Sequence, residues 1–421
     1  MQHINGKDSP EIASLNNPSA PEPRALSDPD TYQQGHPLED YARAQNGCPI
    51  AWQRDAEGYF AVTGHPEIRN ISSDPSQFCS AFGFKLKNDS YSRLGDDIDA
   101  AMRHVILATD PPLHNHLRDV LNRFFGPQAM RDREPSIRRL VSEVLDELPL
   151  GRPIDIVRSA TAPLPIRVLC DLMEVPVDDR ERVYHWTNRL TGADDPEYNP
   201  SPAAAAAVFR EVFEYGRELF RTRRVSPGKD ILSAFGNAEI NGHLLDERFT
   251  DGFFVLMVAA GNETTRNAIT GLLYLLAKHP EQRDQLLSDP ALIRNAVEEA
   301  LRIVSPVIHM RRTAVESATV DNASVAAGDR LALFYGAANH DARVFSDPSR
   351  FDIHRANARM HLAFGTGPHN CVGAPLARLE IRLFIEEFLR RFPRYELSGD
   401  PCWLRSDFVA GIKSLQITLK H

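Results

Sequence analysis

The sequence predicts a single large domain that is mainly α-helical with a minor β component. Apolar residues recur at helical spacing through most of residues 110–306. Short apolar runs separated by Gly328 and Asp329 follow in residues 314–334, and they are typical of strands and turns. The 421 residues would allow two or three domains by length alone. No linker or internal repeat divides the chain, so we expect one domain.

The N-terminal 35 residues differ in composition from the rest of the chain. They are rich in Ser, Pro, Asn and charged residues, and they contain no apolar segment that could act as a secretion signal. We therefore expect residues 1–35 to form a disordered leader and residues 36–421 to form the folded domain. Residues 59–63 then predict a first strand, because this β-type run precedes the turn residues Gly64 and Pro66.

The centre of the chain predicts long helices. Residues 203–207 are five consecutive alanines, and alanine has the highest helix propensity. Another helix is expected after Cys371, and residues 415–419 predict a C-terminal strand. The long helices that we expect span residues 112–125, 132–148, 202–224, 248–279 and 290–304.

The composition excludes several classes of protein. A net charge of −9, from 48 basic and 57 acidic residues, argues against nucleic acid as a partner. The longest apolar run, residues 253–260, is much shorter than the roughly 20 residues that cross a bilayer, so we expect no membrane anchor. The five cysteines are widely spaced without a CxxC pair, so we expect no disulfide framework and a cytoplasmic location.

One cysteine, Cys371, lies among glycines directly ahead of an amphipathic stretch. A helix start favours a thiolate and a depressed pKa, and Gly365, Gly367 and Gly373 would let the backbone pass close to a flat, bulky group. A lone thiolate argues against zinc and iron–sulfur cages and favours haem iron with a proximal thiolate. The alternative is a Gly-rich turn that carries a buried free cysteine.

Polar residues interrupt the apolar helix expected at 248–279, from Ala260 to Thr265. Gly261 costs about 1 kcal/mol relative to alanine in a helix interior, and the close approach of a flat group would offset that cost. Thr264 can bond back to the carbonyl one turn earlier and open the helix, and its hydroxyl beside the Glu263 carboxylate can relay protons. The alternative is a polar helix face or a break between two helices.

Two further pairs of charged residues lie at helical spacing. His114 and Arg118 follow an expected N-cap at Asp110 and share one helix face, where two cations suit an anion. The alternative is a basic pair at the surface. Glu299 and Arg302 are three residues apart, and on spacing alone they indicate a solvated helix face.

These four segments, in this order, resemble the cytochrome P450 family. Its haem-binding loop has the pattern Phe-Gly-x-Gly-x-His-x-Cys-x-Gly, and all six fixed positions match, at Phe364, Gly365, Gly367, His369, Cys371 and Gly373. The resemblance covers about residue 38 to the C-terminus and implies the cytochrome P450 fold, with Arg355 joining Glu299 and Arg302 in a buried structural network. It also implies heme b, iron protoporphyrin IX, with Cys371 as the metal ligand. The cofactor-binding residues that it implies are His114, Arg118, Ala260, Gly261, Arg312, Phe364, Gly365, His369, Cys371 and Gly373.

The resemblance further implies a haem-thiolate monooxygenase that hydroxylates a hydrophobic small molecule, terpenoid, sterol or lipid-like, with O₂ and two electrons. Glu263 and Thr264 are its implied catalytic acid and alcohol. No Rossmann Gly-x-Gly-x-x-Gly segment is visible, so we expect a separate ferredoxin with its reductase as the donor. A basic docking patch is expected from Arg118, Arg123, Arg378 and Arg382. The alternatives are a peroxide-driven or non-oxidative haem-thiolate enzyme, and a haem-thiolate sensor without turnover.

The resemblance also indicates which segments line the substrate pocket. They are mainly apolar, which favours a hydrophobic substrate. His309 is the polar exception, and we favour a hydrogen bond to nearby backbone over a contact with the substrate. The segments are residues 82–91, 185–190, 253–260, 304–310 and 408–410.

Overall fold

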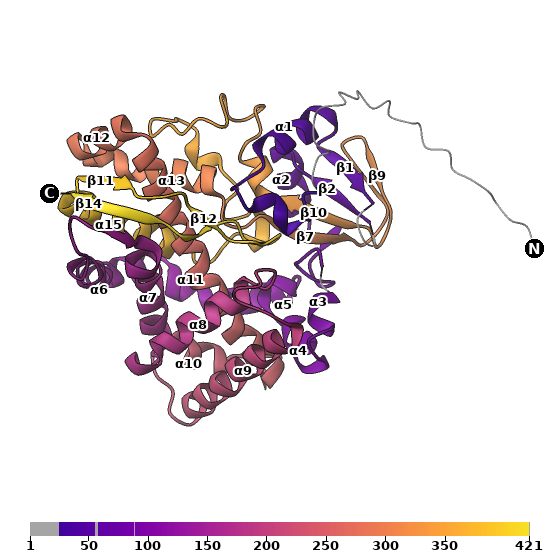
Figure 1. The fold of residues 1–421 in the computed structure, drawn as a ribbon. Helices are drawn as coiled ribbons and strands as arrows, with labels where there is room; N and C mark the ends of the chain where they lie inside the picture. Colours follow the sequence, from indigo (N-terminus) through magenta and orange to yellow (C-terminus); the bar gives the residue numbers. More distant parts are fainter. Residues whose placement is uncertain (1–24, 55–57, 88, 421) are drawn as a thin grey trace, which may run out of the picture.

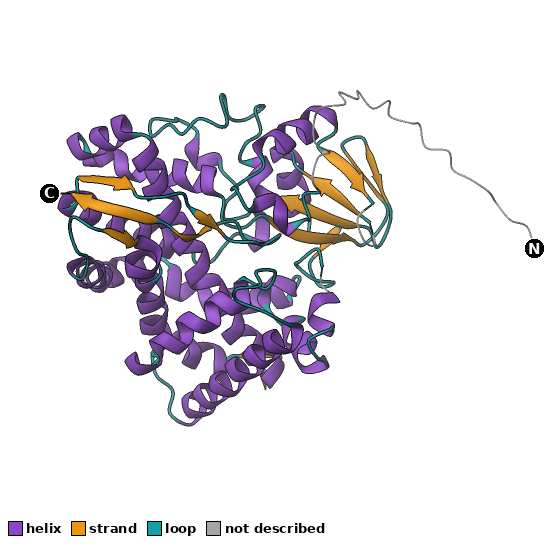
Figure 2. Ribbon diagram, viewed as in Figure 1, coloured by secondary structure: helices purple, strands orange, loops and turns teal. Residues whose placement is uncertain are grey.

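The computed structural model describes residues 25–54, 58–87 and 89–420. It is a mainly helical molecule with small β-sheets, of which the largest lies on the right and the C-terminal one on the left in Figures 1 and 2. The predicted fold class, mainly α with minor β in one domain, is confirmed. In the part of the chain that is described, no helix is long and apolar enough to cross a membrane.

Helix α11 (Glu247–Lys278) forms the centre of the helical body. The helix begins where the Asp246 carboxylate accepts hydrogen bonds from the N–H groups of Arg248 and Phe249. Apolar residues cover most of its faces, so it is buried along most of its length. It packs against α4 (Asp96–Met102), α7 (Pro163–Met173), α8 (Arg180–Thr191), α9 (Pro202–Val225), α13 (Ile293–Val304) and α15 (Ala374–Arg391).

The expected long helices are present, with some different ends. Helix α5 (Leu113–Phe125) ends where predicted, but α6 (Pro127–Asp146) begins before residue 132 because proline is tolerated in the first turn of a helix. The predicted N-cap at Asp110 is wrong, because its carboxylate accepts from the N–H groups of Ser80 and Ala81, at 2.8 and 2.9 Å. The other helices are α1 (Leu38–Gly47), α2 (His65–Ser73), α3 (Asp89–Ser92), α10 (Ile231–Gly236), α12 (Pro280–Ser288) and α14 (Tyr335–Ala338).

The largest sheet has the strand order β1-β2-β10-β7-β3. Strands β2 and β10 pair in parallel, whereas the other neighbours are antiparallel. The long connection from β2 to β10 carries most of the helical body, so the sheet joins the segments that precede and follow this body. Its strands are β1 (Ile50–Gln53), β2 (Tyr59–Val62), β3 (Phe78–Cys79), β7 (His309–Ala314) and β10 (Arg330–Phe334).

Smaller sheets complete the β component. Strand β14 (Gln416–Lys420) lies between β11 (Arg394–Leu397) and β4 (Pro153–Asp155), so the predicted C-terminal strand is present. The two-stranded pairs are β5 (Glu239–Ile240) with β6 (His243–Leu244), β8 (Ala318–Val320) with β9 (Ala323–Val325), and β12 (Cys402–Trp403) with β13 (Ile412–Ser414).

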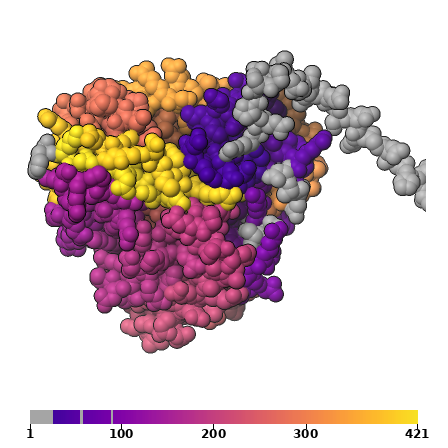
Figure 3. Space-filling model, in the orientation of Figure 1, coloured from indigo at the N-terminus to yellow at the C-terminus, as the bar shows by residue number. Residues whose placement is uncertain are grey.

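The folded part of the chain begins at an earlier residue than we expected. Most of the predicted leader, residues 1–24, lies outside the described residues. Its last part, residues 25–35, is described and includes a 3₁₀ turn at Pro29–Tyr32 with a buried Tyr32, so the predicted leader boundary at 35 is too late. Asp30 pairs with Arg405, and Figure 3 shows the C-terminal segment (yellow) against the N-terminal one (indigo).

The charged pair on α13 is buried rather than solvated. Arg302 donates to both oxygens of Glu299, each at 2.8 Å, and Arg355 donates to Glu299 Oε1 at 3.0 Å. Arg302 also donates to the carbonyls of Asn339 and Pro348, at 2.8 and 2.7 Å. The three-residue network that the family resemblance implied is therefore present, and it ties α13 to the segment before the cysteine loop.

Candidate active site

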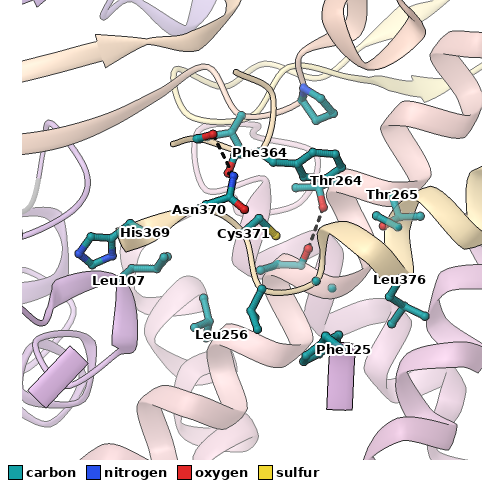
Figure 4. Close-up of a pocket in the computed structure, with 18 of the residues that line it drawn as sticks. Leu107, Phe125, Leu256, Thr264, Thr265, Phe364, His369, Asn370, Cys371 and Leu376 are labelled. Carbon is teal, nitrogen blue, oxygen red and sulfur yellow. Dashed lines mark hydrogen bonds between the residues drawn. The ribbon is translucent and has the colours of Figure 1, made fainter. Parts of the chain in front are cut away.

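A cavity of about 240 Å³ lies between α11 and the cysteine loop, residues 364–373. Helices α5, α7 and α15 and strand β7 complete its walls. Figure 4 draws Thr264 of α11, Cys371 and His369 around it. Eleven of the predicted site residues line this cavity: His114, Arg118, Ala260, Gly261, Thr264, Arg312, Phe364, Gly365, His369, Cys371 and Gly373.

The cysteine loop is held by its own backbone. Gly365 and Gly367 have φ angles of 68° and 70°, a left-handed conformation that favours glycine. A Cβ on Gly367 would lie 2.2 Å from the carbonyl oxygen of Ser72, so the loop is seated directly against α2. The N–H of Cys371 donates to the carbonyl of Phe364 at 2.8 Å, and the Asn370 side chain donates to the carbonyl of Gly365 at 3.1 Å. These contacts present the Cys371 sulfur to the cavity.

The thiol of Cys371 differs from our expectation in its protonation. The side chain is exposed to the cavity, and desolvation by the surrounding protein raises its pKa, although the N–H groups of Gly373 and Ala374 and the charge of Arg118 act in the opposite direction. The expected depression of the pKa by the helix start is therefore wrong for the protein by itself, since desolvation has the larger effect. A bound metal cation would favour the thiolate in this position.

Four potential cations lie at one end of the cavity. His114 and Arg118 project from α5, Arg312 projects from β7, and His369 belongs to the cysteine loop. Among the described residues, neither arginine forms an ion pair with a carboxylate. Arg118 donates to the Asn370 carbonyl, and Arg312 donates to the Arg311 carbonyl at 2.8 Å. Burial lowers the pKa of both arginines, so this end of the cavity suits an anionic group.

Helix α11 contributes Thr264 and Gly261 to the opposite wall. Thr264 Oγ1 donates to the carbonyl of Ala260 at 2.8 Å, which is the predicted bond to the preceding turn and is drawn in Figure 4. A Cβ on Gly261 would lie 3.1 Å from Leu169 Cδ1. The glycine therefore permits close packing against α7, a contact that the sequence did not indicate.

Glu263 is the one predicted site residue that does not line the cavity. Its carboxylate is fully buried on the other side of α11, where it forms an ion pair with Arg266. Asn267 Nδ2 donates to Oε1 at 3.2 Å, and Thr191 Oγ1 donates to Oε2 at 3.3 Å. Glu263 and Thr264 are adjacent in sequence, yet the Thr264 side chain lines the cavity and the Glu263 side chain lies outside it.

Several residues of the cavity were not anticipated. Ile106, Leu107 and Leu169 are part of its apolar lining, while the segments 82–91, 185–190 and 408–410 are not. Glu380 of α15 is the one carboxyl group among the described residues of the lining. Its Oε2 has no hydrogen-bond partner among these residues, and burial raises its pKa to about 8.

His309 has a structural environment. Its Nδ1 lies 3.0 Å from the carbonyl oxygen of Asp407, and its Nε2 accepts from the N–H of Leu86 at 3.2 Å. Burial lowers its pKa to about 4, so the ring is neutral near pH 7. The favoured interpretation, a histidine bonded to backbone, is correct, and the ring joins residue 86 to residue 407.

The cavity fits a flat metal macrocycle that carries acidic groups. One cysteine sulfur, an apolar lining and a cationic end that has no carboxylate ion-pair partner within the described part of the chain meet in it. Within the described ranges, no group of three or more His, Cys, Asp or Glu side chains is arranged to hold a bare metal ion. These features match haem with a proximal thiolate and propionate groups at the cationic end.

Comparisons with known proteins agree with this geometry. The cytochrome P450 family model matches residues 203–417. A linalool 8-monooxygenase of Pseudomonas putida is 37% identical over 399 residues, covering 94% of this chain and 98% of the relative. A methyl-branched lipid omega-hydroxylase of Mycobacterium tuberculosis is 37% identical over 367 residues, covering 86% of this chain and 84% of the relative. The crystal structure of a cytochrome P450 from Novosphingobium aromaticivorans has a TM-score of 0.84 at 30% identity, covering 94% of this chain and 97% of that chain. The chain therefore belongs to the cytochrome P450 family, and it is a monooxygenase whose cofactor is heme b.

Proposed function

We propose that this monooxygenase hydroxylates a hydrophobic small molecule of terpenoid, sterol or lipid-like kind. The supporting observation is the apolar lining of the cavity outside its cationic end. Most of its side chains are aliphatic or aromatic, with Thr264, Thr265 and Glu380 as polar exceptions, so substrate binding relies mainly on the burial of apolar surface. Linalool and methyl-branched lipids, named for two relatives, are molecules of this kind. The residues of this lining include Leu107, Leu256, Met257, Val307 and Met310.

The residues of the cavity have distinct proposed roles toward the cofactor. Bound heme b supplies the activation of O₂. Cys371 is the proposed metal ligand, and a thiolate in that position donates electron density that favours O–O cleavage. The proposed partners of the haem carboxylates are His114, Arg118, Arg312 and His369. The residues proposed to lie against the haem faces are Ala260, Gly261, Phe364, Gly365 and Gly373.

We assign proton delivery to Thr264 and Glu263. The Thr264 hydroxyl lines the cavity and donates to Ala260, so its oxygen can accept a hydrogen bond from water in the cavity. The Glu263 side chain, about 100° further round the same helix, is buried outside the cavity and is the proposed acid. This pair favours a monooxygenase over a sensor or a peroxide-driven enzyme, because those two would not need delivered protons.

We propose a ferredoxin with its reductase as the electron donor. The expected basic patch is partly neutralised, because Arg378 pairs with Glu298 and Arg382 pairs with Glu134 and Glu386. Arg123 is the better residue to test, since its side chain is exposed and forms no ion pair with the residues that the structure describes. Arg123→Glu should slow reduction and flatten its salt dependence, whereas unchanged reduction kinetics would dismiss the patch.

Turnover assays test the proposed function directly. Hydrophobic compounds that shift the haem from low to high spin are first selected as candidate substrates. Each is then incubated with NADH, a ferredoxin and its reductase, and NADH use and hydroxylated product are measured. Product that depends on both NADH and O₂ supports the proposal. Product formed with peroxide alone would favour the peroxide-driven alternative, and spin shifts without any product would favour a sensor.

A further inference from the structure

The turn from α13 into β7, residues 304–306, has a strained backbone. Ser305 has a φ of 39° and a ψ of 67°, a left-handed conformation that is uncommon for a residue other than glycine. Such a conformation persists only where surrounding contacts hold it. The residues that follow, Pro306, Val307 and Met310, line the cavity. The contacts that hold the turn therefore also set the positions of these side chains in the cavity.

His36 of the N-terminal segment caps the end of α13 at this turn. Its Nε2 donates to the carbonyl of Val304 at 2.8 Å, and its Nδ1 accepts from the Tyr41 hydroxyl at 2.9 Å. The proton is on Nε2 because a carbonyl oxygen can only accept. Desolvation by the surrounding protein lowers the pKa of His36, so the neutral ring keeps both bonds near pH 7. The last carbonyls of a helix have no partner within the helix, so His36 supplies one from a distant part of the chain.

The His36 ring and the Val304 side chain are each seated against a glycine. A Cβ on Gly336 would lie 2.6 Å from His36 Cε1, and a Cβ on Gly271 of α11 would lie 2.4 Å from Val304 Cγ2. At both positions a side chain would fit only if its neighbour moved. The ring centroid of His36 also lies 6.2 Å from that of His340. Val304 is therefore held between α11 on one side and the N-terminal segment on the other.

Other segments hold the rest of the turn and the strand that follows it. The Asn339 side chain donates to Ser305 Oγ at 2.9 Å, and the N–H of Ile308 donates to the carbonyl of Phe408 at 2.9 Å. These bonds fix the middle and the far end, while His36 holds the start. Loss of the His36 bond would loosen the start of the turn, so the strained residue would relax while the segments around it stay bonded.

We propose that His36 is a positioning residue for substrate binding: its bond to Val304 fixes the strained turn and thereby sets the width of the cavity at Val307 and Met310. The N-terminal segment then takes part in substrate selection, although the described residues that line the cavity begin at Ile106. This inference rests on the binding of hydrophobic substrates proposed above. Burial of apolar surface is not directional, so the shape of the cavity decides which molecules fit. A loosened turn should therefore reduce the discrimination between narrow and wide molecules.

The first arm of the test measures hydrogen exchange of the backbone amides in residues 304–310 and needs no turnover. His36→Phe keeps a ring but loses both bonds, so exchange in this segment of the holoenzyme should become several-fold faster. His36→Gln keeps an N–H donor of similar reach and should stay close to the wild type. Gln45→Leu is the matched control, because Gln45 of α1 donates to the carbonyls of Thr63 and Ala337, at 2.9 and 2.8 Å, and not to the turn.

The second arm measures the dissociation constants of two apolar compounds, one linear and one polycyclic, that shift the haem spin state of the wild type at clearly different concentrations. In His36→Phe the ratio of the two constants should move several-fold toward one, because a loosened turn admits both shapes. His36→Gln should restore most of the wild-type ratio. Gln45→Leu should leave the ratio unchanged even where it lowers the free energy of unfolding in urea as much as His36→Phe does. The ratio therefore separates positioning from stability.

The outcomes of the two arms decide the role of His36. An unchanged ratio in His36→Phe would overturn the inference, even with faster exchange, because His36 would then be a structural contact only. The same change of ratio in Gln45→Leu would also overturn it. If His36→Phe does not fold, Tyr41→Phe takes its place, since it removes the hydroxyl that orients the ring. If the wild type binds both compounds but hydroxylates neither, the proposed function fails for them, and the ratio still tests the positioning by His36.

Discussion

The rings of His114 and His369 lie 4.2 Å apart between their centroids, although one belongs to α5 and the other to the cysteine loop. Burial, with Arg312 and His114 nearby, lowers the pKa of His369 to about 2, and burial also lowers the pKa of His114. Two neutral rings can pack this closely without repulsion. Next to them lie Arg118 and Arg312, whose positive charges are not balanced by a carboxylate among the described residues, so this end of the cavity favours an anion.

Removing one of these cations should weaken haem retention. Arg312→Gln loses a buried guanidinium that we assign to a haem carboxylate, and a charge-assisted hydrogen bond contributes about 1.5–3 kcal/mol. Haem affinity should therefore fall by roughly ten- to a hundredfold, measured as transfer of haem to an acceptor protein. Arg123→Gln, on α5 but outside the cavity lining, is the control. Equal retention in the two variants would exclude Arg312 from the cofactor site.

Substitution of the proposed metal ligand should remove the spectral signature of a thiolate. Cys371→Ser should lose the reduced carbon-monoxide difference band of a thiolate-ligated haem, because a serine oxygen is a poor replacement for sulfur. The exposed Cys402 provides a matched control, and Cys402→Ser should keep the full band. A Cys371→Ser protein with stoichiometric haem and an unchanged band would assign the iron to another ligand.

Loss of the Thr264 hydroxyl should uncouple NADH use from product. Thr264→Ala removes the group that we assign to the proton path. At a similar rate of NADH use, the yield of product per NADH should fall several-fold and the yield of hydrogen peroxide should rise correspondingly. Thr264→Ser keeps a hydroxyl at the same position and should retain most of the coupling. Full coupling in the alanine variant would contradict the assigned role.

The buried network on α13 should contribute to stability and not to catalysis. Glu299→Gln leaves Arg302 and Arg355 without a counter-charge, which should cost about 3–5 kcal/mol in the free energy of unfolding, measured in urea. Glu218→Gln breaks an exposed pair with Arg221 and should cost less than about 1 kcal/mol. A similar loss in both variants would show that burial adds nothing to the Glu299 pair.

Glu380 should make stability depend on pH. Its pKa in the folded protein is about 8, above the usual 4.5, so the folded state keeps a proton that the unfolded state releases. The associated stability is fully present below pH 4.5 and is lost as the pH rises to about 8. Relative to Glu380→Gln, the wild type should lose up to about 5 kcal/mol across this window. Urea unfolding of both proteins at the two limits measures the difference, and a constant difference would place Glu380 near its ordinary pKa.

Much of the site was predictable because it is built from local sequence. The cysteine loop needs left-handed glycines at fixed positions, and Gly365 and Gly367 are visible in the sequence. His114 and Arg118 share a face because helical geometry repeats about every four residues. The different directions of the Glu263 and Thr264 side chains could also have been predicted, because neighbouring residues of a helix point about 100° apart.

The remaining features depend on tertiary packing. The contact of Leu169 with Gly261 arises from the approach of α7 to α11, which no local pattern encodes. The raised pKa of Cys371 follows from desolvation by the protein around the cavity, and this exceeds the local effect of the helix start. Asp110 could be placed as a cap from sequence, but its bonds to residues 80 and 81 come from a distant segment of the chain.

The seating of Gly367 against Ser72 has a consequence for cofactor capture. A loop clamped to α2 and closed by its own hydrogen bonds is held in shape by contacts within the protein that do not involve the porphyrin. The entropy of ordering these residues is then not subtracted from the affinity for the pigment. A tetrapyrrole therefore binds to a preorganised site, and the site selects it by its planar shape and by the positions of its carboxylate groups.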